Sequence, residues 1–297
     1  MALARTIDEL TGVRPLRLLP LHKSSFGPTY RAEFADRPPL FIKTFEEPSE
    51  RFFAEADGLR AIARTGAIRT PEIAGVSDRL LALEYIETAS PARGDERREQ
   101  ALLGSQLASM HLASVRLASA HHKSRFGYPR DNFIGALPQP NRAHDAFIDF
   151  YREERLLPMR VRASDALGAD GRALLDRLID TLDERLLMDE PPSLIHGDLW
   201  SGNIMMAAAK GAEPSGPVLV DPAVAYADRE LDLAMLDLFG GVSAVFDEAY
   251  DAVFPRRAGS EARRPIYQLY YLLVHVALFG GSYIDSTKRS LRAILSP

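Results

Sequence analysis

The sequence of 297 residues predicts an α+β protein of two lobes. Short apolar runs broken by Gly and Pro fill residues 14–47, a single helical pattern follows them, and long helical patterns dominate beyond Thr88. We therefore expect a small antiparallel-sheet lobe with one helix over residues 1–87. A larger, mainly helical lobe is expected over residues 88–297, since a chain of this length has room for two cores.

The small lobe is predicted from strand and helix signals. Its strands are expected at Leu16–Leu21, Tyr30–Phe34, Leu40–Phe45, Glu72–Val76 and Leu80–Ile86. Between the third and fourth strands, Pro48 and Ser49 are typical of a helix start, and Gly66 ends the helical pattern.

The larger lobe is predicted from apolar residues at helical spacing. The expected helices are Asp95–Leu117, Ala143–Arg155, Arg172–Leu187, Leu231–Phe239 and Ile266–Leu278. Two apolar segments between them, Ser193–Ile204 and Val218–Asp221, are predicted to be short strands that lead into loops.

Composition excludes several classes of function. The net charge of −5 leaves no broad basic face, so neither nucleic acid nor a membrane is an expected partner. There are no cysteines, which excludes disulfides, thiolate metal sites and a cysteine nucleophile. The segment Met1–Gly12 lacks the pattern of a signal peptide, and Leu269–Phe279 is shorter than the roughly 20 residues of a membrane span. We expect a cytoplasmic protein.

The residues most typical of a catalytic site form the run His196-Gly197-Asp198-Leu199-Trp200-Ser201-Gly202-Asn203. Asp198 and Asn203 have the D-x-x-x-x-N spacing of a kinase catalytic loop. In such a loop the Asp reaches the hydroxyl that attacks the γ-phosphate, while the Asn turns back to bind magnesium. The same pair also suits a turn between two strands, and the spacing alone leaves that alternative open.

A second acidic element lies downstream. The apolar run Val218–Val220 ends at Asp221, where a kinase carries its magnesium-binding Asp. Pro222 and Ala223 follow, so the mobile Phe of protein kinases is absent. Because Pro restricts both its own φ and the residue before it, we expect a rigid metal loop.

A third element lies upstream, where Phe41-Ile42-Lys43 is an apolar strand with one Lys and Glu55 follows at a helical position. Lys43 is predicted to hold the α- and β-phosphates of ATP, and Glu55 to orient Lys43. Seen alone, Lys43 better fits a snorkelling side chain at a strand edge and Glu55 a solvated residue on a helix. The order of strand Lys, helix Glu, catalytic Asp, Asn and metal Asp matches the phosphoryl-transfer template, and this order favours the functional interpretation.

The nucleotide loop is the least typical element. The segment His22–Gly27 has one Gly in place of G-x-G-x-x-G, so Ser24 and Ser25 with the backbone N–H groups are the candidates for holding phosphate oxygens. An ordinary hairpin turn fits this segment as well. Glu84, Tyr85 and Ile86 end the last strand of the small lobe, where an adenine is expected to pair with backbone groups.

Over most of its length the chain resembles the fructosamine kinase family, relatives of the aminoglycoside and choline kinases. The most specific segments are Leu194–Asn203 (LIHGDLWSGN), Val220–Ala223 (VDPA), Asp228–Met235 and Leu238–Gly241. Shorter similar fragments are Phe126–Tyr128, Asp131-Asn132, Gly135, Gln139–Asn141, Leu269–Tyr271, His275 and Phe279–Gly281. The combination of HGDLWSGN with DPA is narrower than the HGD and Asn that many small-molecule kinases share.

The resemblance implies a two-lobed protein-kinase-like fold with the nucleotide bound by residues 1–87. It implies transfer of the γ-phosphate of ATP, with Mg²⁺, to the 3-hydroxyl of a ketosamine such as a fructosamine or ribulosamine. That activity would make the protein a deglycation enzyme. Its partner would be a small ketosamine or a glycated lysine on a protein, and the protein itself is expected to be a monomer or weak homodimer.

The resemblance also assigns roles to residues. Asp198 is the catalytic carboxylate and contacts the substrate, Asn203 and Asp221 hold magnesium, and Lys43 with Glu55 forms the phosphate clamp.

Three more assignments concern residues around the predicted catalytic Asp and the segment that begins at Arg229. Trp200, the only Trp, is expected to stack on the C–H face of the sugar, although a hydrophobic plug is the alternative. His196 is expected to hold the shape of the loop, and the acidic and basic residues from Arg229 to Asp232 are expected to brace the large lobe.

Two segments depart from the family, and the first of them leaves the acceptor open. Aromatic residues usually follow the Gln-Pro-Asn element, but Arg142, Ala143 and His144 follow Asn141 here. The single-Gly nucleotide loop is the other departure. A kinase for another sugar, an aminoglycoside or a choline-like acceptor is therefore the alternative to a ketosamine kinase. A nucleotide-binding pseudokinase is disfavoured because none of the expected catalytic residues is missing.

Overall fold

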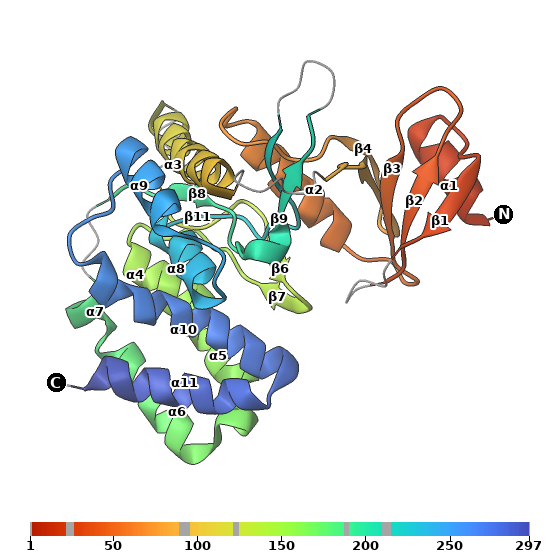
Figure 1. The fold of residues 1–297 in the computed structure, drawn as a ribbon. Helices are drawn as coiled ribbons and strands as arrows, with labels where there is room; N and C mark the ends of the chain where they lie inside the picture. Colours follow the sequence, from red (N-terminus) through yellow and green to blue (C-terminus); the bar gives the residue numbers. More distant parts are fainter. Residues whose placement is uncertain are drawn as a thin grey trace.

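The two lobes lie side by side in the computed structural model, with the sheet at one end and the helical body at the other (Figure 1). The structure describes residues 2–21, 27–88, 96–120, 125–186, 190–209 and 215–296. The predicted α+β class is confirmed.

A five-stranded antiparallel sheet forms the small lobe, in the order β1-β2-β3-β5-β4. Its strands are β1 (Arg17–Pro20), β2 (Thr29–Glu33), β3 (Leu40–Thr44), β4 (Ile73–Val76) and β5 (Leu80–Glu84). All five lie within the predicted segments apart from the first residue of β2. In the register of the sheet, Lys43 of β3 pairs with Thr29 on one side and Leu81 on the other, which places it in the middle of the sheet.

Helices pack on both faces of the sheet. The predicted helix, α2 (Arg51–Ala63), buries Phe52, Ala56 and Leu59 against Leu81 and Leu83 of β5.

A second helix, α1 (Ala2–Thr11), covers the other face, where Ile7 is fully buried. The expectation of one helix in this lobe thus missed α1, although its apolar residues Leu3, Ile7 and Leu10 recur at helical spacing.

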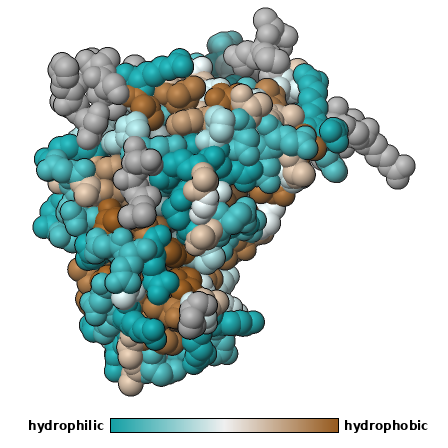
Figure 2. Space-filling view, turned by 90° about the vertical axis from the view of Figure 1, so that its left-hand side faces the viewer, coloured by the Kyte–Doolittle hydropathy of each residue, from teal (hydrophilic) through white to brown (hydrophobic). Residues whose placement is uncertain are grey.

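Helices dominate the larger lobe, as predicted. They are α3 (Glu96–Ala120), α4 (Phe147–Phe150), the π-helix η1 (Tyr151–Leu156), α5 (Leu157–Arg162), α6 (Ser164–Asp180), α7 (Leu182–Arg185), α8 (Glu230–Leu238), α9 (Ala244–Val253), α10 (Ser260–Phe279) and α11 (Ser282–Leu295). Hydrophilic side chains cover much of the face in Figure 2, interrupted by smaller hydrophobic areas.

At the centre of this lobe lies α10, which buries most of its residues from Ile266 to Val276. The apolar run Leu269–Phe279 is therefore part of a core helix. In the described part of the chain, no helix has the length and apolarity needed to cross a membrane.

Short strand pairs place the loops that matter for function. The pairs are β6 (Asn132–Ile134) with β7 (Leu137–Gln139), β8 (Ser193–Ile195) with β11 (Ala225–Ala227), and β9 (Ile204–Ala207) with β10 (Gly216–Leu219). The loop after β8 and the loop after β10 consequently run next to each other, and the Val220 N–H donates to the Asn203 carbonyl at 3.0 Å.

Candidate active site

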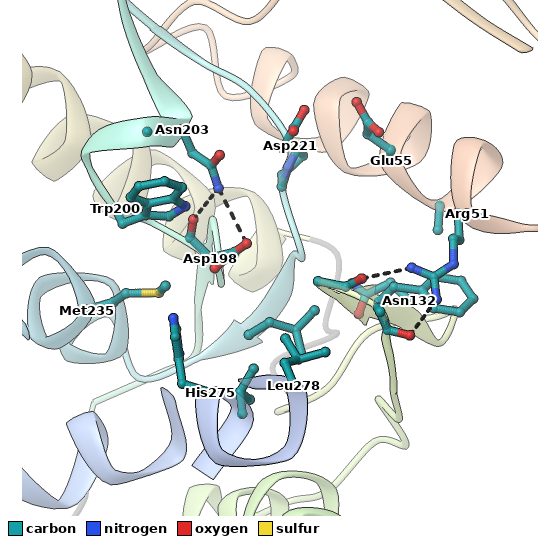
Figure 3. A pocket seen from close by; sticks show the side chains of 18 of the residues that line it. Arg51, Glu55, Asn132, Asp198, Trp200, Asn203, Asp221, Met235, His275 and Leu278 are labelled. Atoms are coloured by element: carbon teal, nitrogen blue, oxygen red, sulfur yellow. Dashed lines mark hydrogen bonds between the residues drawn. The ribbon is translucent and has the colours of Figure 1, made fainter. Parts of the chain in front are cut away.

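A cavity of about 880 Å³ lies between the sheet lobe and the helical lobe. Its walls come from β3 and α2 of the small lobe, the β6–β7 hairpin, the loops after β8 and β10, and the helices α8, α10 and α11. Figure 3 shows polar side chains at one end of this pocket and Met235, His275 and Leu278 at the other.

Asp198 and Asn203 face each other at the middle of the pocket (Figure 3). The Asn203 amide donates to the backbone carbonyl of Asp198 at 2.7 Å, and its nitrogen lies 3.4 Å from Asp198 Oδ2. A short 3₁₀ turn, η2 (Ser201–Asn203), brings the amide back over the loop. Burial, followed by the negative charge of Asp221, raises the pKa of Asp198 to about 7.

The loop that carries Asp198 is held from below by a buried carboxylate. Asp232 of α8 accepts hydrogen bonds from the backbone N–H groups of His196 at 2.7 Å and Gly197 at 2.9 Å. Gly197 has φ of +82°, and a Cβ at this position would stand 2.1 Å from the carbonyl oxygen of Ala223. Only glycine is accommodated here, because the backbone is left-handed and the neighbouring loop leaves no room for a Cβ atom.

His196 hydrogen-bonds within its own loop and also links it to the loop after β10, a second role that the sequence did not predict. Its Nε2 lies 2.9 Å from the Val220 carbonyl oxygen, and its Nδ1 accepts the Asp198 N–H at 3.3 Å. Burial lowers the pKa of His196, although Asp232 opposes the shift. The imidazole is therefore neutral, with both nitrogens committed to the backbone.

Asp221 meets Lys43 and Glu55, the residues predicted to form the phosphate clamp. Lys43 Nζ donates to Glu55 Oε1 at 2.8 Å and also to Asp221 Oδ1. Burial by itself would raise the pKa of Asp221, but the Lys43 ammonium lowers it below the ordinary value. The predicted strand Lys, helix Glu and loop Asp thus come together, although they are far apart in the sequence.

The backbone of Asp221 is strained. Its φ of +55° is the one positive value for a non-glycine residue among the residues described. A left-handed residue directly before Pro222 costs free energy, and such strain is typically retained where it aims a functional side chain.

Three oxygen-bearing side chains, Asp198, Asn203 and Asp221, therefore face one space beside Lys43 (Figure 3). Carboxylate and amide oxygens without nitrogen or sulfur ligands are the donor set that suits Mg²⁺. The residues present consequently fit a magnesium ion.

Two contacts that the sequence did not predict tie α2 to the large lobe. Arg51, in its first turn, donates to the carbonyls of Gly135 at 2.8 Å and Ala136 at 2.5 Å and lies over the Phe133 ring. Farther along the helix, Asp57 accepts a hydrogen bond from the Tyr128 hydroxyl at 2.8 Å. Both contacts fix the helix that carries Glu55.

Trp200 lines the pocket next to Asp198 and is 41% exposed (Figure 3). The indole lies over Gly202, where a Cβ would come within 2.3 Å of the ring. A buried hydrophobic plug is thereby excluded, because a large part of the ring faces open space.

Other predicted site residues lie elsewhere. Ser24 and Ser25 are outside the described residues. Glu84 ends β5 and Tyr85 and Ile86 follow it, but none of them is in the lining of this pocket. The Tyr85 N–H donates to Pro39 O at 3.3 Å, and the Glu84 carboxylate pairs with Arg69 at 2.5 Å. The adenine position stays a prediction.

The segment after Asn141, which left the acceptor open, turns away from the pocket. Arg142 Nε and His144 Nε2 lie 2.9 and 3.0 Å from the Glu154 carboxylate in η1. Arg142, His144 and Glu154 are all outside the lining of the cavity. Arg142, Ala143 and His144 therefore contribute nothing to the lining of this pocket.

Comparison with known proteins now adds to this geometry. The sequence model of the Fructosamine kinase family matches residues 18–297. The chain belongs to the fructosamine kinase family. A protein of Enterococcus faecium named "Probable ketoamine kinase" is 33% identical over 276 residues, which are 90% of this chain and 91% of the relative.

Solved structures agree with this membership. A fructosamine-3-kinase family structure from Thermobifida fusca superposes with a TM-score of 0.85 at 37% identity, covering 99% of this chain and 98% of the other. A choline kinase of Streptococcus pneumoniae has a TM-score of 0.62 at 14% identity, covering 100% and 98%. The second likeness shows the protein-kinase-like fold alone.

Proposed function

We propose that the protein transfers the γ-phosphate of ATP to the 3-hydroxyl of a ketosamine. The observation that carries this proposal is that one pocket brings together the polar residues predicted for phosphoryl transfer and an exposed Trp. These residues are Lys43, Glu55, Asp198, Trp200, Asn203 and Asp221. Membership of the fructosamine kinase family and the name of the Enterococcus relative support a ketosamine as the acceptor.

In this proposal the polar end of the pocket binds the triphosphate. Lys43, oriented by Glu55, contacts the α- and β-phosphates, and Ser24 and Ser25 are the candidates at the nucleotide loop. Asn203 and Asp221 would hold Mg²⁺, which when bound neutralises phosphate charge. Glu84, Tyr85 and Ile86 are the candidates for the adenine.

The chemical step forms one bond and breaks another. The acceptor oxygen bonds to the γ-phosphorus, the bond from that phosphorus to the β,γ-bridging oxygen breaks, and ADP leaves. Asp198 orients the hydroxyl and accepts its proton. Because phosphoryl transfer proceeds through a loose transition state, alignment and charge neutralisation matter more than strong base catalysis.

Trp200 gives the acceptor its position beside Asp198. An indole face packs against the C–H groups of a sugar ring, so stacking would set the 3-hydroxyl toward the Asp198 carboxylate. Phosphorylation at this hydroxyl would make the enzyme part of a deglycation reaction, on free ketosamines or glycated lysines. A cytoplasmic location and a monomeric or weakly dimeric state stay predictions.

ATP consumption with magnesium tests the proposal against a panel of acceptors: a ribulosamine, a fructosamine, an aminoglycoside and choline. We expect turnover with the ketosamines alone. The Asp198→Asn variant should lose a factor of roughly 10² to 10⁴ in turnover and still bind ATP, because the amide cannot accept the proton.

The other outcomes separate the alternatives. Turnover with the aminoglycoside or choline alone would keep the kinase mechanism and discard the ketosamine. ATP binding without turnover of any acceptor would identify a pseudokinase. Unchanged turnover in Asp198→Asn would remove the catalytic role of Asp198.

A further inference from the structure

Four ring side chains gather at the apolar end of the pocket, where α8 ends and α10 meets α11. Phe239, His275, Phe279 and Tyr283, called the aromatic corner below, all line the cavity. The His275 ring centroid lies 4.7 Å from Phe239, 5.6 Å from Phe279 and 4.8 Å from Tyr283. The imidazole is thus the centre of a ring cluster, and Figure 3 shows it projecting from α10 into the pocket below Asp198.

The hydrogen bond of His275 defines which nitrogen carries the proton. Nδ1 lies 2.8 Å from the Tyr271 carbonyl oxygen, which can only accept, so Nδ1 is the donor. Burial lowers the pKa of His275, and the ring is therefore neutral at pH 7. Nε2 is left with a lone pair and has no hydrogen-bond partner among the described residues. It is a hydrogen-bond acceptor inside a corner whose other members are aromatic rings, with the Tyr283 hydroxyl as the other polar group.

The acidic side chains of the pocket all lie at one of its two ends. Among the described residues that line it, the acidic ones are Glu55, Asp198 and Asp221, all of which belong to the reaction centre. The aromatic corner has no carboxylate of its own. The several ammonium groups of an aminoglycoside would find no carboxylate partner there, whereas the ring faces could hold one amine together with the apolar group on it.

The aromatic corner also opens to the surface. Phe279 is 65% exposed, and the turn after it runs through Gly280 and Gly281, with φ of +61° and +58°. The positive φ angles of these glycines allow α10 to end and α11 to begin within two residues. The short turn holds Phe279 at the mouth of the pocket. A substituent that leaves the buried part of the pocket would pass across its ring.

We propose that the aromatic corner binds the amine end of the acceptor, with its apolar N-substituent packed on Phe279 and Tyr283 and its N–H donated to His275 Nε2. This proposal rests on the proposed ketosamine kinase function. In a ketosamine the nitrogen is bonded to C1, and C2 separates C1 from the carbon that carries the 3-hydroxyl. An acceptor with this hydroxyl at Asp198 therefore extends its amine toward another part of the pocket. The aromatic corner would then determine which amines are accepted.

The proposal is tested by comparing kcat/KM for two acceptors that differ in one chemical feature, and two such pairs are used. The first pair is N-benzyl-fructosamine and unsubstituted 1-amino-1-deoxyfructose; the second is N-benzyl-fructosamine and 1-O-benzyl-fructose, which lacks the N–H. The wild-type enzyme should prefer the benzyl amine in both. Phe279→Ala should reduce the first preference about fivefold, because the packed ring is lost.

His275→Phe should reduce the second preference about tenfold, through KM for the acceptor, because it keeps a ring and removes the acceptor atom. Val161→Ala is the matched control, since Val161 is 69% exposed on α5 and does not line the pocket. It should leave both preferences at the wild-type values. ATP binding by each variant checks that the pocket is intact.

The possible failures are distinguishable. If the wild-type enzyme turns over no ketosamine, the proposed function itself is wrong. If ketosamines are turned over but Phe279→Ala and His275→Phe leave both preferences unchanged, the aromatic corner does not bind the amine end. A wild-type preference for the unsubstituted amine would overturn the packing of the N-substituent in the same way.

Discussion

Asp232 accepts the Gly197 N–H at 2.9 Å and so supports, from within the core, the loop that presents Asp198 to the pocket. The same carboxylate accepts the His196 N–H and lies 3.2 Å from His111 Nε2. Asp232 is fully buried, so its removal would leave two backbone donors without a partner in a region closed to water.

We expect Asp232→Ala to lower the free energy of unfolding by roughly 2–5 kcal/mol, because buried unpaired donors are costly. Asp232→Asn should cost less, since the amide oxygen still accepts one of the two N–H groups. Thermal unfolding followed by calorimetry measures both. The control is Asp237→Ala on the same helix, where a half-exposed side chain should contribute about 1 kcal/mol or less. Equal unfolding temperatures for Asp232→Ala and Asp237→Ala would contradict the bracing role.

Removing one charge from the proposed magnesium ligands should weaken metal use. Asp221→Asn keeps an oxygen ligand and loses the negative charge, so we expect about a tenfold rise in the magnesium concentration for half-maximal activity. A titration of activity with magnesium at fixed total ATP checks it. Asp165→Asn, the same change at an exposed position outside the pocket, is the control. An unchanged magnesium requirement in Asp221→Asn would remove Asp221 from the metal site.

Arg51 should affect nucleotide use without being a catalytic residue, because it ties the helix carrying Glu55 to the β6–β7 hairpin. We expect Arg51→Ala to lower kcat/KM for ATP about tenfold, the effect of losing a charged hydrogen bond. Arg51→Lys should recover part of this loss. Arg60→Ala, an exposed position on the same helix, should have no effect.

Tyr128→Phe distinguishes positioning of α2 from direct substrate contact. It removes the other tie, to Asp57, and Tyr128 does not line the pocket. Its kcat/KM for ATP should fall as well. If Tyr128→Phe behaves as wild type while Arg51→Ala raises KM for the acceptor, Arg51 acts by contact and the positioning role is wrong.

Gly202 sets the place of the only Trp, since a Cβ there would overlap three atoms of the indole. We expect Gly202→Ala to displace the ring, raise KM for the acceptor roughly tenfold and leave ATP binding intact. Trp fluorescence should report the displacement. Gly216→Ala is the control, because its nearest contact, at 3.4 Å, is ordinary packing. Weaker ATP binding with an unchanged acceptor KM would place Trp200 at the nucleotide instead.

Local patterns made parts of the fold and site predictable. The strands of the small lobe follow apolar runs between turn residues, and α2 follows helical spacing, so each was visible within about ten residues of sequence. The pairing of Asp198 with Asn203 is local too, because one 3₁₀ turn closes it. The helix α1 was not predicted, although the apolar spacing of a helix is present in its sequence.

Long-range contacts were predictable only where a chemical template required them. Lys43, Glu55 and Asp221 were expected together because phosphoryl transfer needs them in that order, and the structure brings them into contact. No such template exists for Arg51 and the carbonyl of Gly135, which are 84 residues apart. A backbone carbonyl is present at every residue, so the sequence carries no signal for which one an Arg will reach.

By itself the sequence determined the α+β class, the loop that pairs Asp198 with Asn203 and the identity of the charged residues, since these depend on short periodic patterns and on chemistry that few residue types perform. Only the tertiary structure decided that Arg142 and His144 turn away from the pocket and that Asp232 supports the loop. It also placed His275 among three rings, with an acceptor nitrogen that has no partner among the described residues. The physical reason is that burial, ring packing and the direction of a hydrogen bond are set by neighbours from distant segments, which become neighbours when the chain folds.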